Sequence, residues 1–269
     1  LRPGAGPGRG ADLENLLTGL GFVQVDSVNT LARAHDLILW SRRGQYRPEA
    51  LDHLIARQRA GFEHWTHDAA VIPMRFYPMW RLKFARDEAH MQRRWPRLRR
   101  EGWGAELEGV LRQIADHGPA SVSDLGGDEP RGSGGWWDWH PSKTALEYLW
   151  RSGRLAICHR TGFRKVYDLA ERVIPAEHLA ARLEDAEILD WALAGALQRL
   201  GFATSGELAA FFDIATPEEA KLWCARALAA GRIIEIGVEM ADGSIRRSYA
   251  DPALPAQVAA LPEPSSRVR

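Results

Sequence analysis

The sequence lacks the features that mark several common protein classes. It has only two cysteines, Cys158 and Cys224, and neither belongs to a C-x-x-C pair. Two such residues cannot build a disulfide framework or, by themselves, a thiolate zinc site, so we expect both to be small buried side chains. Basic and acidic residues each number 35, so net charge alone does not indicate a nucleic-acid partner.

No stretch of the sequence is apolar for the length of a bilayer span, and residues 1–10 are rich in glycine, proline and arginine rather than resembling a signal peptide. We therefore expect a cytoplasmic protein without a membrane partner. The chain has no initiator Met and ends in Pro-Glu-Pro-Ser-Ser-Arg-Val-Arg, which is typical of a linker that has been cut short.

Most catalytic signatures are also missing. The sequence has no G-x-x-x-x-G-K-[ST], no H-E-x-x-H and no G-x-S-x-G, so we expect no nucleotide cofactor. His64 and His67 have a spacing that suggests metal ligands, but on a strand this spacing places the two imidazoles on opposite faces. We expect neither a metal nor any other cofactor.

What the sequence does contain is a repeated pattern, which is clearest in residues 187–250. An apolar helical stripe over 187–200 ends at Gly201, and a short helix over 205–212 follows. Thr216-Pro217-Glu218-Glu219 is a capping box that opens a third helix, which Gly231 ends in left-handed geometry. Two β-rich runs, 232–239 and 245–249, then flank an Asp-Gly turn. Three helices followed by a hairpin predict a winged helix.

Two earlier segments repeat this pattern. In the middle copy, residues 118–125 align with 201–208 without a gap, a helix is predicted from about Pro141 to Arg151, and a hairpin over 155–169 turns at Thr161-Gly162. In the first, looser copy, Pro48 opens a helix that Gly61 closes. An additional helical stretch, 31–42, is inserted before this helix, and the copy is expected to lack its opening helix.

The sequence therefore predicts a mainly α fold with small β-hairpin wings, arranged as three tandem winged-helix (helix-turn-helix) units. The expected boundaries are 1–100 for the first unit with a basic connector, 101–178 for the second and 179–254 for the third. Residues 255–269 are expected to be a truncated linker to a missing C-terminal β-barrel domain.

A winged helix usually places its third helix in the major groove of DNA and its hairpin on the backbone. Lys143, Arg164 and Lys165 fit this use in the second unit, and Trp139 precedes its third helix, where a ring suits stacking on an exposed base. From Arg75 to Arg100, nine basic residues face two acidic ones, a stripe suited to phosphates. The alternatives are ordinary solvated charges and core packing of the tryptophan.

The segment Phe22-Val23-Gln24-Val25-Asp26-Ser27-Val28 carries the most chemical information. On a short strand, Gln24 and Asp26 point the same way while Val23 and Val25 face the core. An amide that holds a water molecule beside a carboxylate that takes its proton suits hydrolysis of an N-glycosidic bond. The alternative is structural, because Asp26-Ser27 also stands where the N-cap of a helix belongs.

This segment, continuing to Asn29 and into Ala32-Arg33-Ala34-His35, resembles the signature of the YcaQ-like (AlkX-type) crosslink-repair DNA glycosylases, relatives of AlkZ. The stretches 64–73 (HWTHDAAVIP) and 137–149 (WDWHPSKTALEYL) agree, and the resemblance extends from about Leu16 to the C-terminus. It implies tandem winged helices around DNA, with Gln24 and Asp26 as the catalytic pair. It also implies further site or DNA-contacting residues, namely Asn29, Arg33, His35, His67 and Lys143.

The resemblance implies a monofunctional hydrolase that removes N7-alkylated purines from double-stranded DNA and unhooks interstrand crosslinks. We expect a nucleoid-associated monomer. Members of this family begin with another helix and continue into a β-rich barrel, and this chain has neither intact. The alternative function is a non-catalytic winged-helix transcriptional regulator, and a third is a protein–protein adaptor.

Overall fold

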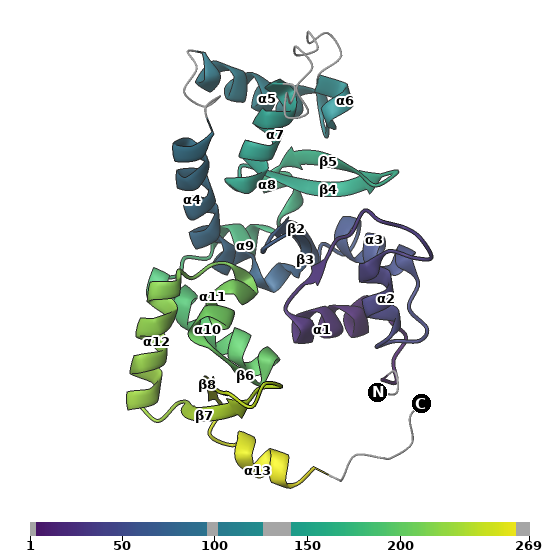
Figure 1. The fold of residues 1–269 in the computed structure, drawn as a ribbon. Helices are drawn as coiled ribbons and strands as arrows, with labels where there is room; N and C mark the ends of the chain where they lie inside the picture. The colour runs from purple at the N-terminus through teal and green to yellow at the C-terminus, as the bar shows by residue number, and fades with distance from the viewer. Residues whose placement is uncertain (1–3, 96–101, 126–140, 262–269) are drawn as a thin grey trace. The chain divides into compact units, whose positions relative to one another are not determined.

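The computed structural model describes residues 4–95, 102–125 and 141–261, and the chain divides into two compact units, 1–184 and 185–269 (Figure 1). Both units combine helices with small antiparallel sheets, as the sequence predicts. Within the described ranges, no helix has the length and apolar character needed to span a membrane. The three-unit domain boundaries expected from the sequence stay a prediction.

The first part of unit 1 is a group of three helices and a three-stranded sheet. Its elements, in chain order, are α1 (Gly10–Leu20), β1 (Val23–Gln24), α2 (Ala34–Trp40), α3 (Pro48–Ala56), β2 (Gly61–Trp65) and β3 (Ala69–Pro73). The strands lie in the order β1-β3-β2, and both pairings are antiparallel. Leu13, Leu17, Leu39 and Leu54 are fully buried between the helices and the sheet, so each helix contributes apolar residues to one core.

Three expectations for this group were wrong. The opening helix is present as α1, because Leu13 and Leu17 supply the buried apolar face that a helix needs. The stretch read as an insertion is α2, which lies between β1 and α3 as α11 (Ser205–Phe212) lies between β6 (Phe202–Ala203) and α12 (Pro217–Ala229). Gly61 does not close α3. It begins β2, where a Cβ would approach the Leu54 and Val71 side chains to within 3.2 and 3.3 Å.

The rest of unit 1 is organised around a second core. Its elements are η1 (Met74–Phe76), α4 (Tyr77–Arg94), α5 (Trp103–His117), α6 (Val122–Leu125), α7 (Pro141–Arg151), β4 (Leu155–Thr161), β5 (Arg164–Leu169), α8 (Ala170–Val173) and α9 (Ala176–Ala180). Helix α7 has the bounds predicted from the sequence. Leu146, Leu149 and Trp150 on α7 are buried against Ile114 of α5. An isolated bridge joins Ala120 to Tyr167 of β5.

The β4–β5 hairpin forms as predicted, but its turn lies one residue later than expected. Thr161 pairs with Arg164, so Gly162 and Phe163 are the two turn residues rather than Thr161 and Gly162. Both turn residues have positive φ, +53° and +68°. A two-residue hairpin turn with positive φ at both positions matches the right-handed twist of its strands.

Unit 2 contains α10 (Asp185–Leu200), β6, α11, α12, β7 (Ile234–Glu239), β8 (Ile245–Ala250) and α13 (Leu254–Ala259). Its strands lie in the order β6-β8-β7. The predicted capping box at Thr216 is confirmed, since Thr216 Oγ1 accepts the Glu219 N–H and Glu219 returns the bond. Gly231 has φ +67°, which confirms the predicted left-handed end of the helix.

Candidate active site

The segment with Gln24 and Asp26 lies at the edge of the first sheet, because among the described residues β1 pairs with β3 alone. Val23 is opposite Val71 and Gln24 opposite Ala70, and the Val25 N–H continues the ladder to the Ala69 carbonyl at 2.8 Å. Val23 is buried, whereas Val25 is only partly buried against the same core. Strand alternation therefore directs Gln24 and Asp26 to the side away from this core, where both are partly exposed.

Asp26 does not cap a helix. Helix α2 begins eight residues later, its N-cap position is Arg33, and no side chain caps it. The Asp26 carboxylate instead receives the Val28 N–H on Oδ1 at 2.8 Å, a local turn that shapes the loop after β1. Its other oxygen, Oδ2, has no hydrogen bond within the described part of the chain. The alternative that Asp26 is a helix N-cap was thus wrong, because α2 begins at Ala34. Asp26 Oδ2 is left to accept a hydrogen bond from a ligand or water.

Gln24 is oriented by Asp68, a residue that the sequence reasoning did not select. Gln24 Nε2 donates to Asp68 Oδ2 at 3.1 Å, and Asp68 Oδ1 accepts the Ala69 N–H at 2.7 Å. Because a carboxylate accepts but does not donate, the amide nitrogen faces Asp68 and the amide oxygen is left to accept a hydrogen bond. The signal was its place in the β2–β3 turn, within the stretch that carried the family resemblance.

His35 is located next to Asp26, and the side chains of His35 and Arg33 both contact Phe163. His35 is 7% exposed, and its Nδ1 accepts the Asp26 backbone N–H at 3.2 Å. Burial lowers the pKa of His35, and the Asp36 carboxylate opposes this effect in part. The Arg33 guanidinium lies 4.2 Å from the centroid of the Phe163 ring. Both side chains thus contact the protein itself, whereas Asn29, in the loop between β1 and α2, is exposed.

A cavity of about 260 Å³ lies behind this segment, lined by both groups of unit 1. Burial raises the pKa of the Asp52 carboxyl, and the charges of Asp36, Glu49 and Glu63 act in the same direction. Tyr46 donates to Asp36 at 2.8 Å. The lining of this cavity is therefore rich in carboxylates. The guanidinium groups of Arg33 and Arg160 offset part of their negative charge. The lining residues are Val25, Arg33, His35, Asp36, Pro48, Leu51, Asp52, Ile55, Glu63, Val71, Arg160, Gly162 and Phe163.

The two histidines of the 64–73 stretch differ in their surroundings. His64 is 2% exposed on β2, with the rings of Phe84 and Trp150 at 4.8 and 5.4 Å. Burial lowers its pKa to about 3, so it is neutral at physiological pH. His67 is exposed in the β2–β3 turn, edge-on to Phe22 at 6.0 Å. Within the residues described, no three histidine, cysteine or acidic side chains are grouped to hold a metal.

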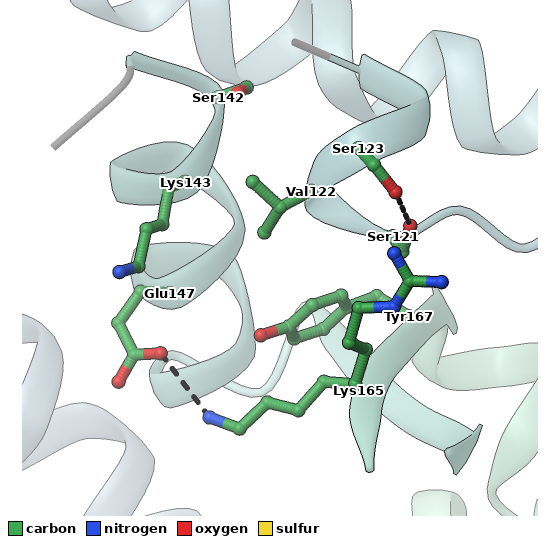
Figure 2. Close-up of a pocket in the computed structure, with 9 residues that line it drawn as sticks. Ser121, Val122, Ser123, Ser142, Lys143, Glu147, Lys165 and Tyr167 are labelled. Carbon is green, nitrogen blue, oxygen red and sulfur yellow. Dashed lines mark hydrogen bonds and ion pairs between the residues drawn. The ribbon is translucent and has the colours of Figure 1, made fainter. Parts of the chain in front are cut away.

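The predicted DNA-contacting residues of the second group line a different cavity, of about 490 Å³, between α6, α7 and β5. Figure 2 shows Glu147 on α7 paired with Lys165 of β5, with Lys143 one helical turn before Glu147. Lys165 is not a simple surface cation, since its Nζ lies 3.5 Å from Glu147 and 3.6 Å from the centroid of the Trp150 ring. Burial lowers its pKa. Lys143 and Arg164 are exposed, and Trp139 lies outside the described residues.

Several other cations of unit 1 make contacts within that unit. Arg160 of β4 forms a two-point ion pair with Glu63 of β2, at 2.7 to 3.1 Å, and Glu63 is 4% exposed. Arg151 pairs with Glu147 at 2.9 Å and lies over the Trp65 ring. Lys83, in the basic stripe on α4, is buried and lies 3.6 Å from Asp87. Arg160 and Arg151 thus connect neighbouring elements, and Lys83 is paired within its own helix, so these three side chains do not form an open basic surface.

Comparisons with known proteins agree with this architecture. The family model of the AlkZ-like DNA glycosylases matches residues 17–269. This chain belongs to the AlkZ-like DNA glycosylase family. Its fold is also similar to that of the DNA glycosylase AlkZ of Streptomyces sahachiroi, with a TM-score of 0.64 at 16% sequence identity. The match covers 93% of this chain and 66% of the AlkZ chain, so the chain spans slightly less than two thirds of that relative's length.

Membership of this family confirms the resemblance recognised in the Gln24–His35 segment. The family match includes the Gln24–Asp26 segment and the β2–β3 turn with Asp68. It also includes Lys143 and Arg164. The assignment of roles to individual residues rests on their geometry in this chain.

Proposed function

We propose that this member of the AlkZ-like family is a monofunctional DNA glycosylase that hydrolyses the N-glycosidic bond of N7-alkylated purines. The observation that carries the proposal is a pair of open oxygens, one on Gln24 and one on Asp26, at the edge of the first sheet. Asp26 Oδ2 and the amide oxygen of Gln24 have no hydrogen-bond partner in the described chain, while the remaining polar atoms of both side chains are fixed. Two fixed acceptors are suited to holding one water molecule.

Hydrolysis of this N-glycosidic bond needs little further assistance from the protein. An N7-alkylated guanine is already cationic, so it leaves as a neutral base when the bond from C1′ to N9 breaks and takes the bonding electrons with it. The sugar develops oxocarbenium character, which the Asp26 carboxylate stabilises. A water molecule held by Gln24 adds to C1′ and gives its proton to Asp26, which returns it to solvent. The products are the free alkylated base and an abasic site.

We further propose that DNA is bound by winged-helix units. The order of helix, short strand, two helices and hairpin occurs at 10–73 and again at 185–250, and the 103–169 region has the same order with the Ala120 bridge in place of the short strand. In a winged helix the third helix contacts the groove, and Lys143 at the start of α7 fits that position. Asn29 and His67 are exposed close to the candidate catalytic pair and suit contacts to the damaged strand.

Interstrand crosslinks formed through guanine N7 contain the same cationic leaving group. The proposed chemistry therefore extends to unhooking one strand of such a crosslink, provided that the second guanine is accommodated. Support for this extension comes from the partly exposed position of the pair at a sheet edge, since an edge admits a bulky adduct more easily than an enclosed pocket. Release of one strand from a nitrogen-mustard crosslink tests it.

The test of the central proposal is base release from duplex DNA with a single N7-methylguanine. We expect the wild-type protein to release N7-methylguanine and to leave unmodified guanine in place. Asp26→Asn retains the oxygen that accepts the Val28 N–H but removes the carboxylate charge, so we expect loss of base release with DNA affinity retained. No release by the wild-type protein, or release by Asp26→Asn at the wild-type rate, would contradict the proposal.

A matched control is available in unit 2. Asp251 accepts the N–H of Ala253, two residues later, at 2.8 Å, which is the same local turn that Asp26 makes with Val28. We expect Asp251→Asn to release base at the wild-type rate. A regulator would bind duplex DNA without base release in any of the three proteins, and an adaptor would show no salt-dependent binding to DNA.

A further inference from the structure

The tip of the β4–β5 hairpin holds a bulky residue in a backbone conformation that such residues rarely adopt. Phe163 is the second residue of the two-residue turn and has φ +68°. This position is usually filled by glycine or asparagine, because a large L side chain in left-handed geometry is sterically disfavoured. A disfavoured backbone persists only where surrounding contacts hold it, and it directs attention to what the Phe163 ring touches.

The ring is enclosed by cations and by an imidazole. The guanidinium carbons of Arg33 and Arg160 lie 4.2 and 4.5 Å from the ring centroid. The His35 ring is nearly parallel to it, at 16° and a centroid distance of 6.3 Å. Arg160 also donates to the Phe163 carbonyl at 2.7 Å, while the Glu63 carboxylate holds Arg160 from the other side. The hairpin tip is therefore held against the first group of unit 1 by these contacts.

His35 connects the hairpin tip to Asp26. Its ring stacks on Phe163, and its Nδ1 accepts the Asp26 N–H. We propose that the β4–β5 hairpin tip, acting through the Phe163 and His35 rings, positions the Asp26 carboxylate for its reaction at the deoxyribose. Phe163 is thus a positioning residue for the candidate catalytic Asp26, and the hairpin serves unit 1 rather than the DNA backbone. This inference rests on the proposed function.

The connection has a built-in dependence on pH. His35 Nδ1 accepts the Asp26 N–H only while it carries no proton. Burial lowers the pKa of His35 and keeps the ring neutral; Asp36 and Glu63 act against this effect, and Arg33 and Arg160 reinforce it. The Phe163 ring lies beside the imidazole, nearly parallel to it at a centroid distance of 6.3 Å, and contributes to its burial. Removing it admits water, so the pKa of His35 rises toward its ordinary value, and the link to Asp26 breaks at a higher pH.

The test compares Phe163→Ala with Phe163→Tyr, which keeps an aromatic ring, and with Ile245→Ala on the 67% exposed first residue of β8 as a control. Single-turnover base release at saturating DNA and duplex Kd are measured from pH 5 to pH 8. We expect Phe163→Ala to lower the rate about tenfold or more with Kd changed by less than about twofold. We also expect its acidic limb to move to higher pH. Phe163→Tyr restores both properties, and Ile245→Ala changes neither.

Two further measurements keep the inference testable whatever Phe163→Ala does to folding or activity. The amide signal of Asp26 in ¹⁵N NMR spectra reports the bond to His35 without any reaction, and its pH midpoint should rise in Phe163→Tyr less than in Phe163→Leu. His35→Asn offers an oxygen near the Nδ1 position that no proton removes. We expect it to keep the neutral-pH rate and to lose the His35 acidic limb.

The outcomes separate the two proposals. An Asp26 amide midpoint that is the same in wild type and Phe163→Leu overturns the positioning role. So does base release by Phe163→Ala with the wild-type rate and pH profile. Absence of base release from wild type, together with an Asp26 amide that follows His35 as expected, overturns the proposed glycosylase function and leaves the positioning of Asp26 by the hairpin in place.

Discussion

The two compact units of this protein are stabilised in different ways. In unit 1, helices α1 to α5 have no side-chain cap, and buried pairs such as Arg160 with Glu63 join elements far apart in the chain. In unit 2, α11 and α12 each begin with a complete capping box, Thr204 with Glu207 and Thr216 with Glu219. Unit 1 therefore depends on long-range contacts, whereas two helices of unit 2 are started by residues that are neighbours in sequence.

The difference matters for the candidate site. Asp26, His35 and Phe163 are brought together only because the elements of unit 1 contact one another over long distances in the chain. A site that depends on such contacts is exact in its geometry but sensitive to changes far away in sequence. Changes to buried groups of unit 1 should therefore have larger effects than changes to surface pairs or helix caps of unit 2.

The largest effect is expected at the Arg160–Glu63 pair. Arg160→Met leaves the Glu63 carboxylate, 4% exposed, without its cation, so we expect a loss of about 3–5 kcal/mol in the free energy of unfolding of unit 1. The counterpart is Arg246→Met, which breaks a surface pair with Glu207 and should cost less than about 1 kcal/mol. Urea unfolding, followed separately for the two units by hydrogen exchange, measures both values.

Similar losses for the two variants would show that unit 1 does not depend on the buried pair. Glu63→Gln is combined with Arg160→Met, because it removes the negative charge that Arg160→Met leaves buried without a cation. We expect Glu63→Gln/Arg160→Met to recover part of the stability lost in Arg160→Met.

The second effect is a loss of stability of unit 1 at acidic pH, caused by the buried His64. The pKa of His64 is lowered by burial to about 3, so the folded state binds fewer protons than the unfolded state from pH 6.5 downward. Stability of unit 1 therefore falls as pH falls through this window, by about 1.4 kcal/mol per pH unit for one such group. Residues 185–269 contain no histidine. Hydrogen exchange at pH 7 and pH 5 should show weaker protection in unit 1 at pH 5.

The stability of unit 2 should fall only at a lower pH than that of unit 1. Hydrogen bonds from Thr204 lower the pKa of Glu207, and the side chain of Arg232 does the same for Asp190, so their contributions are lost below the ordinary carboxylate range. Equal loss of protection in both units between pH 7 and pH 5 would contradict the assignment of the acid response to His64.

The smallest effect is expected at a helix cap. Thr216→Ala removes the oxygen that accepts the Glu219 N–H, and we expect unit 2 to lose about 1 kcal/mol. Thr216→Ser retains a capping hydroxyl and is the control. Thermal unfolding of both variants should give a lower Tm for Thr216→Ala only. A Tm equal to that of the wild type would indicate that packing, rather than the local cap, determines where α12 begins.

The same contrast explains which parts of the fold could be predicted from the sequence. The bounds of α12, the cap at Thr216 and the left-handed Gly231 are local signals, and all were predicted correctly. Gly61 was misassigned because its role, close approach of Leu54 and Val71, is defined by residues that only the tertiary fold brings together. The hairpin turn was misplaced because Phe163 occupies a position at which local preferences favour glycine.

The candidate site follows the same division. Strand alternation predicts that Gln24 and Asp26 point the same way, since it is a property of consecutive residues, and both are partly exposed at the sheet edge. Burial of His35, orientation of Gln24 by Asp68 and the pairing of Lys165 with Glu147 could not be predicted, because each partner is distant or lies on another element. Composition and spacing identify which residues have suitable chemistry, but they do not show which of them the fold uses internally.

The most direct test of the account is the single-turnover rate of N7-methylguanine release by wild type and Asp26→Asn on the same saturating duplex. We predict a decrease of about a hundredfold or more for Asp26→Asn, with Kd for that duplex unchanged within about twofold. Equal rates in the two proteins would contradict the assignment of Asp26 as the group that supports water attack.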